Sequence, residues 1–409
     1  MCNSFESLWS VTAGLFGSLR SLSATRAGLL LIACLWVSGS TALTPANTPP
    51  ALTVHEWGTF TSVAGADGMP LEWLPLAAPS DLPCFVERNR INVKVSVPGT
   101  VRMETPVLYF YASRDTTVDV SVRFRTGVIT EWFPHATVEL SHSCHENALT
   151  GVCSEGTIRW RSVKVSPGAV ENFPFDNRPS HYFTARRTSA NPLQSGVDAE
   201  KFLFYRGVGR FALPLAATID SFGNVTLRQY GRHGVDDVVL FANYGGRITY
   251  SVRRVIDGQV SLDPLVTEQT PAREIERMLL ASGMYPDEAA AMIESWQDSW
   301  FDEGTRLFYI VPRATIDAIL PLEIVPRPSE VARAFVGRME LFTRVEEEAI
   351  TDALRASDFG ALKKYGRFLE AFGRRVLSDT TPSDRPAVEQ RLRAAYSAIA
   401  TTSTSTTLP

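Results

Sequence analysis

Short runs of alternating hydrophobic and polar residues fill the chain from about residue 52 to residue 268. Ile91–Val97, Thr117–Arg125 and Thr157–Val165 are examples, and glycine, proline, asparagine and aspartate separate such runs. Alternation with a period of two is typical of strands that bury one face, and strands about ten residues apart favour an antiparallel sandwich. We therefore predict an antiparallel β-sandwich-like domain over residues 52–268, within a β-rich α+β fold.

The hydrophobic period changes after this domain. Thr270-Pro271 is a helix start signal, and a second helix is predicted from Pro286, so residues 269–304 are expected to form a helical pair. Strand character returns over residues 305–342. These strands could rejoin the sheet, which would make the helical pair an insertion.

The chain beyond Thr343 is predicted to be helical as far as residue 400. Thr343 and Glu346 have the spacing of a capping box, in which each side chain bonds the backbone N–H of the other residue. Residues 401–409 are rich in serine and threonine, and we expect no fixed structure there. The β-rich region is thus expected to carry a helical C-terminal region.

One face of the second predicted helix carries Trp296 and Trp300. Aromatic residues at helical spacing either enter the core or bind a ligand or a partner. We favour the core, because an amphipathic helix that packs on a sheet needs this spacing.

The first 42 residues have the order of a secretory signal. Arg20 and Arg26 precede an apolar run, Ala27–Val37, and small residues then lead to Ala42. We predict cleavage after Ala42, a linker over residues 43–51, and export to the periplasm or out of the cell. The apolar run is shorter than the ~20 residues of a membrane-spanning helix, so no transmembrane anchor is expected after cleavage.

An alternative interpretation of the same segment is a lipoprotein signal. Leu31–Cys34 resembles a bacterial lipobox, in which Cys34 would be lipidated and become the mature N-terminus. The residues after Cys34 continue the apolar run instead of beginning a polar tether. We therefore favour plain secretion.

The composition is that of an ordinary globular protein, and it limits the partners. The 409 residues carry a formal net charge of −4, with 44% hydrophobic and 21% charged residues. A mildly acidic chain without a basic stripe is a poor match for nucleic acid, so no nucleic-acid partner is expected.

Export to an oxidising compartment would favour a disulfide bond between nearby cysteines. Cys144 and Cys153 enclose a short segment rich in turn-forming residues, so we predict that they are joined. Cys84 is left over, and we expect a buried thiol there. His142 and His145 flank Cys144 and are weak candidates for metal ligands. Their spacing matches no zinc motif, so we predict neither a metal nor another cofactor.

The stretch TVHEWGTFTSVAG groups several residues that could carry chemistry. On a strand, Glu56 shares a face with Val54 and Phe60, so its carboxylate enters apolar surroundings. A carboxylate in such surroundings needs a charged partner, or its pKa rises.

Two interpretations of Glu56 follow. The first is a buried ion pair with Arg206 or Arg210, which lie on one face of another predicted strand. The second makes Glu56 a catalytic acid or base beside His55. We favour the ion pair and predict that Glu56 is buried, ionised and held by an arginine.

Glu104 repeats the pattern, because it shares a face with Leu108 and Phe110. Glu56 and Glu104 could form the carboxylate pair of a glycoside hydrolase, one as acid and the other as nucleophile or base. The distance between the two carboxylates decides this question, so enzymatic activity stays open.

Five segments resemble a family of large, uncharacterised exported bacterial proteins. They are VHEWGTFTSV, METPVLYFY, FYRGVGRFALPL, WFDEGTRLFYIVPR and VARAFVGRMEL, which span Val54 to Leu341. The resemblance implies a bacterial cell-envelope setting and carries no activity, cofactor or catalytic residue.

The leading hypothesis is an exported cell-envelope protein that acts as a binding or structural module, with an envelope protein or a glycan as partner. The alternative is a secreted glycoside-type hydrolase that uses Glu56, Glu104 and His55. Tight glutamate–arginine pairs would favour the module, and carboxylates facing solvent in an open cleft would favour the hydrolase.

Overall fold

The computed structural model describes residues 51–75, 81–89, 98–140, 155–178, 180–255, 259–262, 265–266 and 270–405. Residues 50–409 form one compact unit. The predicted signal peptide and the predicted Cys144–Cys153 bridge lie outside the described residues.

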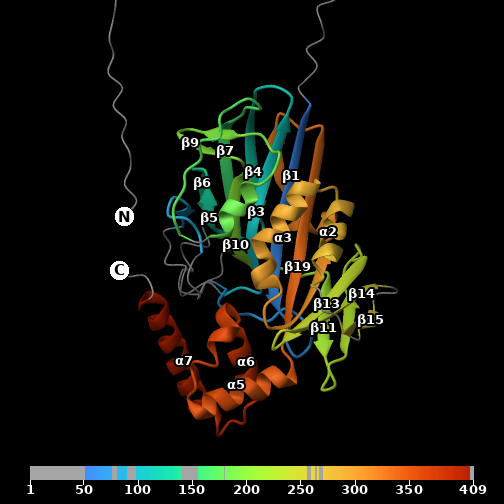
Figure 1. Cartoon of the computed structure of the whole chain (residues 1–409), viewed down its shortest axis with the longest axis vertical. Coiled ribbons are helices and arrows are strands. Elements are labelled where there is room, and N and C mark those ends of the chain that lie inside the picture. Colours follow the sequence, from blue (N-terminus) through green and yellow to red (C-terminus); the bar gives the residue numbers. More distant parts are fainter. Residues whose placement is uncertain are drawn as a thin grey trace, which may run out of the picture. The chain divides into compact units, whose positions relative to one another are not determined.

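A ten-stranded mixed sheet forms the centre of this unit (Figure 1). Its strands lie side by side in the order β16 (Leu265–Val266), β14 (Arg247–Arg254), β13 (Asp237–Tyr244), β17 (Gly304–Ile310), β19 (Glu330–Leu341), β1 (Leu52–Val63), β3 (Val101–Ala112), β10 (Leu203–Gly209), β5 (Gly127–Phe133) and β2 (Glu87–Arg88). β1 lies in the middle, paired in parallel with β19 and antiparallel with β3. Every residue of β1 except Thr53 is buried. The parallel pair makes the sheet mixed, which alternation along the sequence does not reveal.

A second sheet packs on one face of the large sheet. It contains β18 (Leu322–Val325), β4 (Thr116–Phe124), β7 (Gly156–Val165), β8 (Leu193–Ser195) and β9 (Asp198–Glu200), with β6 (Thr137–Leu140) paired to β7. Val118 and Trp160 of this sheet share a hydrophobic cluster with Val54 and Phe60 of β1. A three-stranded sheet of β11 (Leu215–Ile219), β12 (Val225–Gln229) and β15 (Gln259–Leu262) adjoins the same cluster. The predicted β-rich α+β fold is confirmed. The prediction of an antiparallel domain over residues 52–268 is wrong, because β19 pairs in parallel with β1 and lies in the same sheet.

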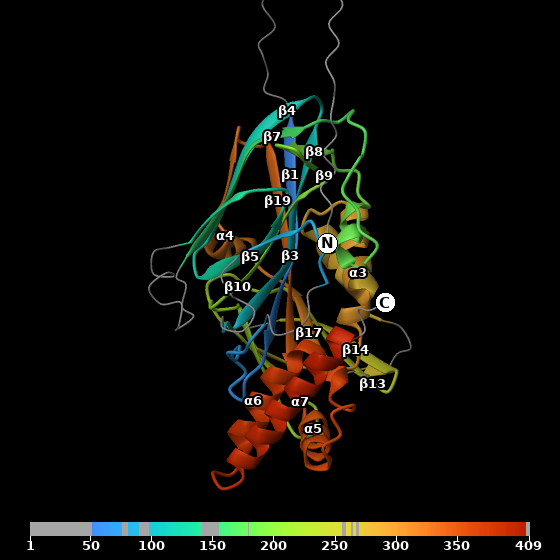
Figure 2. The ribbon, with the colours of Figure 1, turned by 90° about the vertical axis from the view of Figure 1, so that its left-hand side faces the viewer.

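Helices cover the other face of the large sheet. They are the 3₁₀ helix η1 (His181–Arg186), α2 (Ala272–Ala281) and α3 (Pro286–Trp300). Figure 2 shows α3 on one side of β1 and β19, with α4 (Arg313–Ile319) on the other. Trp296 and Trp300 are buried in a second hydrophobic cluster between α3 and the sheet, so the core interpretation of these tryptophans is confirmed.

Strands from late in the chain occupy the middle of the large sheet. β17 and β19 lie between β13 and β1, and α2 and α3 come between β16 and β17 in the sequence. The strands predicted over residues 305–342 therefore rejoin the sheet, and the helical pair is an insertion. β18 is different, because it pairs with β4 in the second sheet.

Four helical segments follow β19 and pack at one end of the large sheet. They are α5 (Arg344–Ala356), η2 (Lys363–Phe368), α6 (Leu369–Asp379) and α7 (Arg385–Ser405), seen below the strands in Figure 1. Their apolar residues form a third hydrophobic cluster with Val63 and Trp73. Thr343 and Glu346 form the predicted capping box of α5. The helix α7 runs to Ser405, so the expectation of no fixed structure is wrong for residues 401–405.

Candidate functional site

Glu56 is fully buried in the middle of β1 and is paired with an arginine. Arg333 lies beside it in register on the parallel strand β19, and its Nε–H donates to Glu56 Oε2. The Tyr205 hydroxyl donates to Oε1 at 2.5 Å. The carboxylate is thus buried and held by an arginine as predicted, but the predicted partners, Arg206 and Arg210, are corrected to Arg333.

The two arginines proposed as partners for Glu56 pair with other carboxylates. Arg206 is buried and donates from Nη1 to Asp81 Oδ1 at 2.9 Å. Burial opposes ionisation of Asp81, but the Arg206 guanidinium holds its pKa well below the ordinary value. Arg210 is more exposed and pairs with Glu72 at 2.6 Å.

His55 does not act with Glu56 or Glu104. Its Nδ1 lies 2.8 Å from Oε2 of Glu288 on α3, and both side chains are fully buried. The Tyr111 hydroxyl donates to the other oxygen of Glu288, also at 2.8 Å. The histidine therefore fastens β1 to the inserted helix α3, which is a structural role.

Glu104 is buried among arginines. Arg367 of η2 donates to both carboxylate oxygens, Arg102 lies 3.4 Å away, and the Thr61 hydroxyl donates at 2.6 Å. Burial opposes ionisation here too, but Arg367 and Arg102 lower the pKa of Glu104. Such a carboxylate is a poor nucleophile, because both of its oxygens are already engaged.

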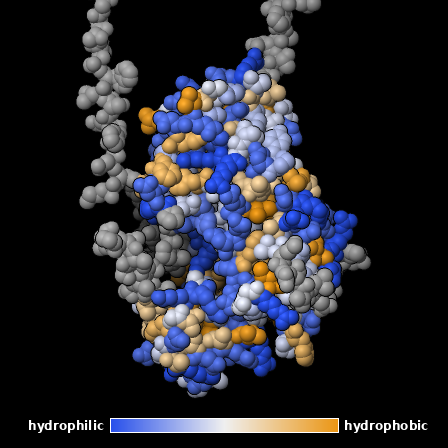
Figure 3. Space-filling view, in the orientation of Figure 1, coloured by the Kyte–Doolittle hydropathy of each residue, from blue (hydrophilic) through white to orange (hydrophobic). Residues whose placement is uncertain are grey.

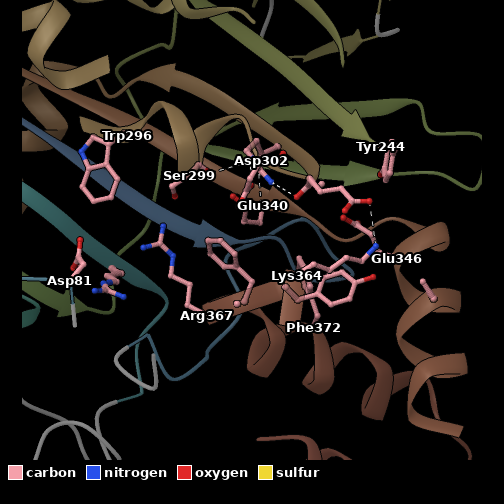
Figure 4. Close-up of a pocket in the computed structure, with 18 of the residues that line it drawn as sticks. Asp81, Tyr244, Trp296, Ser299, Asp302, Glu340, Glu346, Lys364, Arg367 and Phe372 are labelled. Atoms are coloured by element: carbon pink, nitrogen blue, oxygen red, sulfur yellow. Dashed lines mark hydrogen bonds and ion pairs between the residues drawn. The ribbon is translucent and has the colours of Figure 1, made fainter. Parts of the chain in front are cut away.

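A cavity of about 390 Å³ lies above Glu104, where the end of the large sheet meets α3 and the C-terminal helices. The surface is recessed at this junction in Figure 3. Figure 4 shows Trp296, Asp81 and Arg367 towards one end of the cavity, with Tyr244, Glu346 and Lys364 towards the other. A cavity of this size is at the small end of the range for ligand sites, which runs from roughly 300 to 1,000 Å³.

Charged side chains that bond one another form one wall of this cavity. Arg306 donates to Glu340 at 3.1 Å, to Asp302 at 2.6 Å, and to the carbonyl of Trp300 at 2.8 Å. Arg338 donates to the other oxygen of Glu340 at 2.5 Å. Because Arg306 also bonds the last carbonyls of α3, its charge stabilises the C-terminus of that helix.

Two carboxyl groups that line the cavity hold their protons more tightly than usual. Burial raises the pKa of Glu346 to about 7, even though hydrogen bonds from Thr343 oppose the change. Burial also raises the pKa of Asp302, against the attraction of Arg306. Near neutral pH the cavity therefore contains a carboxyl group that can either donate or accept a proton.

Aromatic rings also line the cavity. His181 of η1 stacks on Trp296 with ring centroids 5.6 Å apart and an angle of 17°. The Arg367 guanidinium lies over the ring of Phe368, 4.9 Å from its centroid. The lining thus combines flat apolar surfaces with hydrogen-bonding groups, which is the usual make-up of a small-molecule site.

The predicted residues Cys144, Cys153, His142 and His145 lie outside the described residues, so their disulfide and weak metal assignments stay predictions. Cys84 is exposed, so the expectation of a buried side chain there is wrong. Within the described residues, no group of histidine, cysteine, aspartate and glutamate side chains could hold a metal ion.

The sequence contained a signal for two residues that our interpretation missed. Arg333 and Arg338 are charges among the buried residues of the strand EVARAFVGRMEL, as Glu56 is in β1. A charge placed in a buried strand requires a partner, so these arginines were detectable as members of buried pairs. Asp81 and Arg367 lie outside the strands, and no local pattern distinguishes them.

No protein-family model matches the chain, and no curated protein is similar to it. The resemblance to exported bacterial proteins therefore stays a prediction. None of the helices in the described part of the chain has both the length and the apolar character needed to cross a membrane.

Proposed function

We propose that this chain is an exported cell-envelope protein that binds a small glycan of one or two sugar rings. The observation that carries the proposal is the cavity at the junction of the sheet, α3 and the C-terminal helices. Its lining combines aromatic side chains with charged groups that can bond hydroxyls. The order of residues 1–42 supports export.

Glu56, His55 and Glu104 were the candidate catalytic residues, and the way they are paired favours a binding function over catalysis. Glu56 and His55 are fully buried and are not part of the cavity lining. Glu104 lies beneath the lining and is bonded by Arg367 and Thr61. A glycosidase needs two carboxyl groups on either side of the scissile bond, and these three residues offer no such arrangement.

Asp302 and Glu346 favour a second candidate, a glycoside-type hydrolase. Both line the cavity, and burial raises the pKa of each. A carboxyl group protonated near neutral pH is suited to act as a general acid. Against this candidate, Glu346 is bonded in the capping box of α5 and Asp302 is bonded to Arg306.

Calorimetric titration of the mature protein with monosaccharides and disaccharides tests the proposal. We expect saturable binding that Ala349→Trp removes, because Ala349 lines the cavity and a tryptophan there fills it. Ala356→Trp is the matched control, since Ala356 is exposed on the same helix and is not part of the lining. No binding by the wild type, or binding that Ala349→Trp leaves unchanged, contradicts the proposal.

Release of reducing ends from the bound sugars separates the two candidates. The binding proposal predicts no release over hours, whereas the hydrolase predicts release that Glu346→Gln abolishes. This variant keeps the capping box, because glutamine serves as well as glutamate at that position.

A further inference from the structure

We infer that the ligand of this cavity carries an oxyanion, a carboxylate or a phosphate, which binds beside Arg102, Arg206 and Arg367. This inference rests on the proposed function, because it specifies the ligand of the same cavity. Three observations support it. Three arginines from different elements meet at one end of the cavity, they share fewer carboxylates than there are arginines, and the Nε–H of Arg206 is buried and unbonded.

Three arginines from different elements come together at one end of the cavity. Arg102 is on β3, Arg206 on β10 and Arg367 on η2, and all three line the cavity. Their side chains are 9%, 3% and 17% exposed, so they lie on the floor and not on the outer rim. Figure 4 shows Arg367 at the same end as Asp81, the carboxylate that holds Arg206.

The three arginines on the floor of the cavity pair with only two carboxylates, Asp81 and Glu104, among the described residues. Asp81 pairs with Arg206, which leaves Glu104 to serve both Arg102 and Arg367. Arg338, which is paired with Glu340, lies close enough to act on the same environment. Burial and the repulsion from Arg338 and Arg102 lower the pKa of Arg367 to about 10, although Glu104 and Glu340 oppose this. A second anion at this end would relieve the repulsion.

Buried donors at this end have no acceptor within the described residues, among them the Arg206 Nε–H and the indole N–H of Trp296. The Arg206 guanidinium bonds Asp81 through Nη1 and Nη2, and its Nε–H is buried and unbonded. The Nε–H can only donate a hydrogen bond, so it needs an oxygen with a lone pair. Carboxylate and phosphate oxygens bond guanidinium groups more strongly than sugar hydroxyls do, because the charges assist the bond.

Three sugars that differ only at one carbon test the inference on the wild-type mature protein. Glucuronate carries a carboxylate there, glucose 6-phosphate a phosphate, and glucose a neutral hydroxyl. We expect at least one of the two acidic sugars to bind at least ~10-fold more tightly than glucose, since charge-assisted bonds are about twice as strong as neutral ones. The preference should shrink as salt rises from about 0.1 M to about 1 M, where screening shortens from ~10 Å to ~3 Å.

Two arginine-to-lysine variants test whether the preference for acidic sugars comes from the arginines on the floor of the cavity. Arg206→Lys keeps the charge but removes the Nε–H and the planar fork, so it should weaken binding of the preferred acidic sugar about tenfold. Arg210→Lys is the matched control, because Arg210 lies four positions away and pairs outside the cavity with Glu72. Thermal melts of both variants report whether the fold is kept.

The possible outcomes distinguish a failure of the oxyanion inference from a failure of the glycan-binding proposal. Glucose that binds as tightly as both acidic sugars, or a preference that high salt leaves unchanged, overturns the inference and leaves the glycan-binding proposal standing. Absence of binding by all three sugars, and by the disaccharides of the calorimetric titration, overturns both. Carboxylate and phosphate sources are distinguished by which of the two acidic sugars binds more tightly.

Discussion

Glu56 and Arg333 form a fully buried ion pair across the parallel strands β1 and β19, although 277 residues separate them in the sequence. The pair joins the first strand of the described chain to the last strand of the large sheet. The Arg333 guanidinium also bonds Asp317 and the carbonyl of Leu320. Burial opposes its charge, but Glu56 raises the pKa of Arg333 above its ordinary value, so the arginine stays charged.

Removing one member of this pair should strongly destabilise the fold. Glu56→Gln removes the buried carboxylate and leaves the Arg333 charge paired with Asp317, which is 46% exposed. We expect the free energy of unfolding to fall by about 3–5 kcal/mol. Denaturant unfolding measures this change. The double variant Glu56→Gln with Arg333→Met should lose much less than the sum of the two single losses.

Glu72→Gln is the control for this pair, because Glu72 is 42% exposed in its bond to Arg210. It should change the stability by less than about 1 kcal/mol. A Glu56→Gln protein that unfolds like the wild type but loses sugar binding would contradict the structural role of Glu56.

Glu346 should make the stability depend on pH. Burial raises its pKa from 4.5 to about 7, so the folded state binds the proton more tightly than the unfolded state does. The stabilisation is therefore complete below about pH 4.5 and is lost as the pH rises towards 7, by roughly 3 kcal/mol at most. Denaturant unfolding between pH 4.5 and 8 measures the slope.

The variant Glu346→Gln isolates this contribution. Glutamine keeps the capping box but does not titrate, so this part of the slope should disappear. Glu347→Gln on the next position is the control and should keep the wild-type slope, because Glu347 is less buried than Glu346. Identical slopes for wild type and Glu346→Gln would show that Glu346 is ionised throughout this range.

Gly337 should not tolerate a side chain, because an aromatic ring occupies the space above it. A Cβ atom at Gly337 would lie 2.2 Å from the ring of Tyr309, its cross-strand neighbour on β17. We expect Gly337→Ala to destabilise the fold by about 1–3 kcal/mol, since Tyr309 is fully buried and has nowhere to move. Gly168→Ala is the control, because a Cβ atom at Gly168 would meet no other atom within 4 Å; a shared melting temperature for the two variants would refute the argument.

The mature protein should begin at Leu43. Cleavage after Ala42 follows from the charged, apolar and small-residue order of the first 42 residues. N-terminal sequencing and intact mass of protein expressed with its own leader measure the start. A mature chain that begins at an acylated Cys34 would replace secretion with a lipid anchor.

The sequence by itself determined the classes of structure and the burial of its unusual charges. Alternation predicted the strands, the capping signals at Pro286 and Thr343 predicted helix starts, and the apolar neighbours of Glu56 predicted a buried ion pair. These features can be predicted from local periodicity, because they depend on residues that lie near each other in the chain.

Only the tertiary structure decided the partners. Glu56 meets Arg333, Glu104 meets Arg367 and His55 meets Glu288, each across more than two hundred residues. Arg206 and Arg210 were reasonable candidates by strand face, but β10 lies beyond β3, and β19 is the strand that pairs directly with β1. The cavity likewise exists only where β3, β10, α3 and η2 meet. Such contacts come from the order of the strands and from the docking of the helices. The hydrophobic pattern of a single strand predicts which of its faces is buried, but not which strand or helix lies next to it.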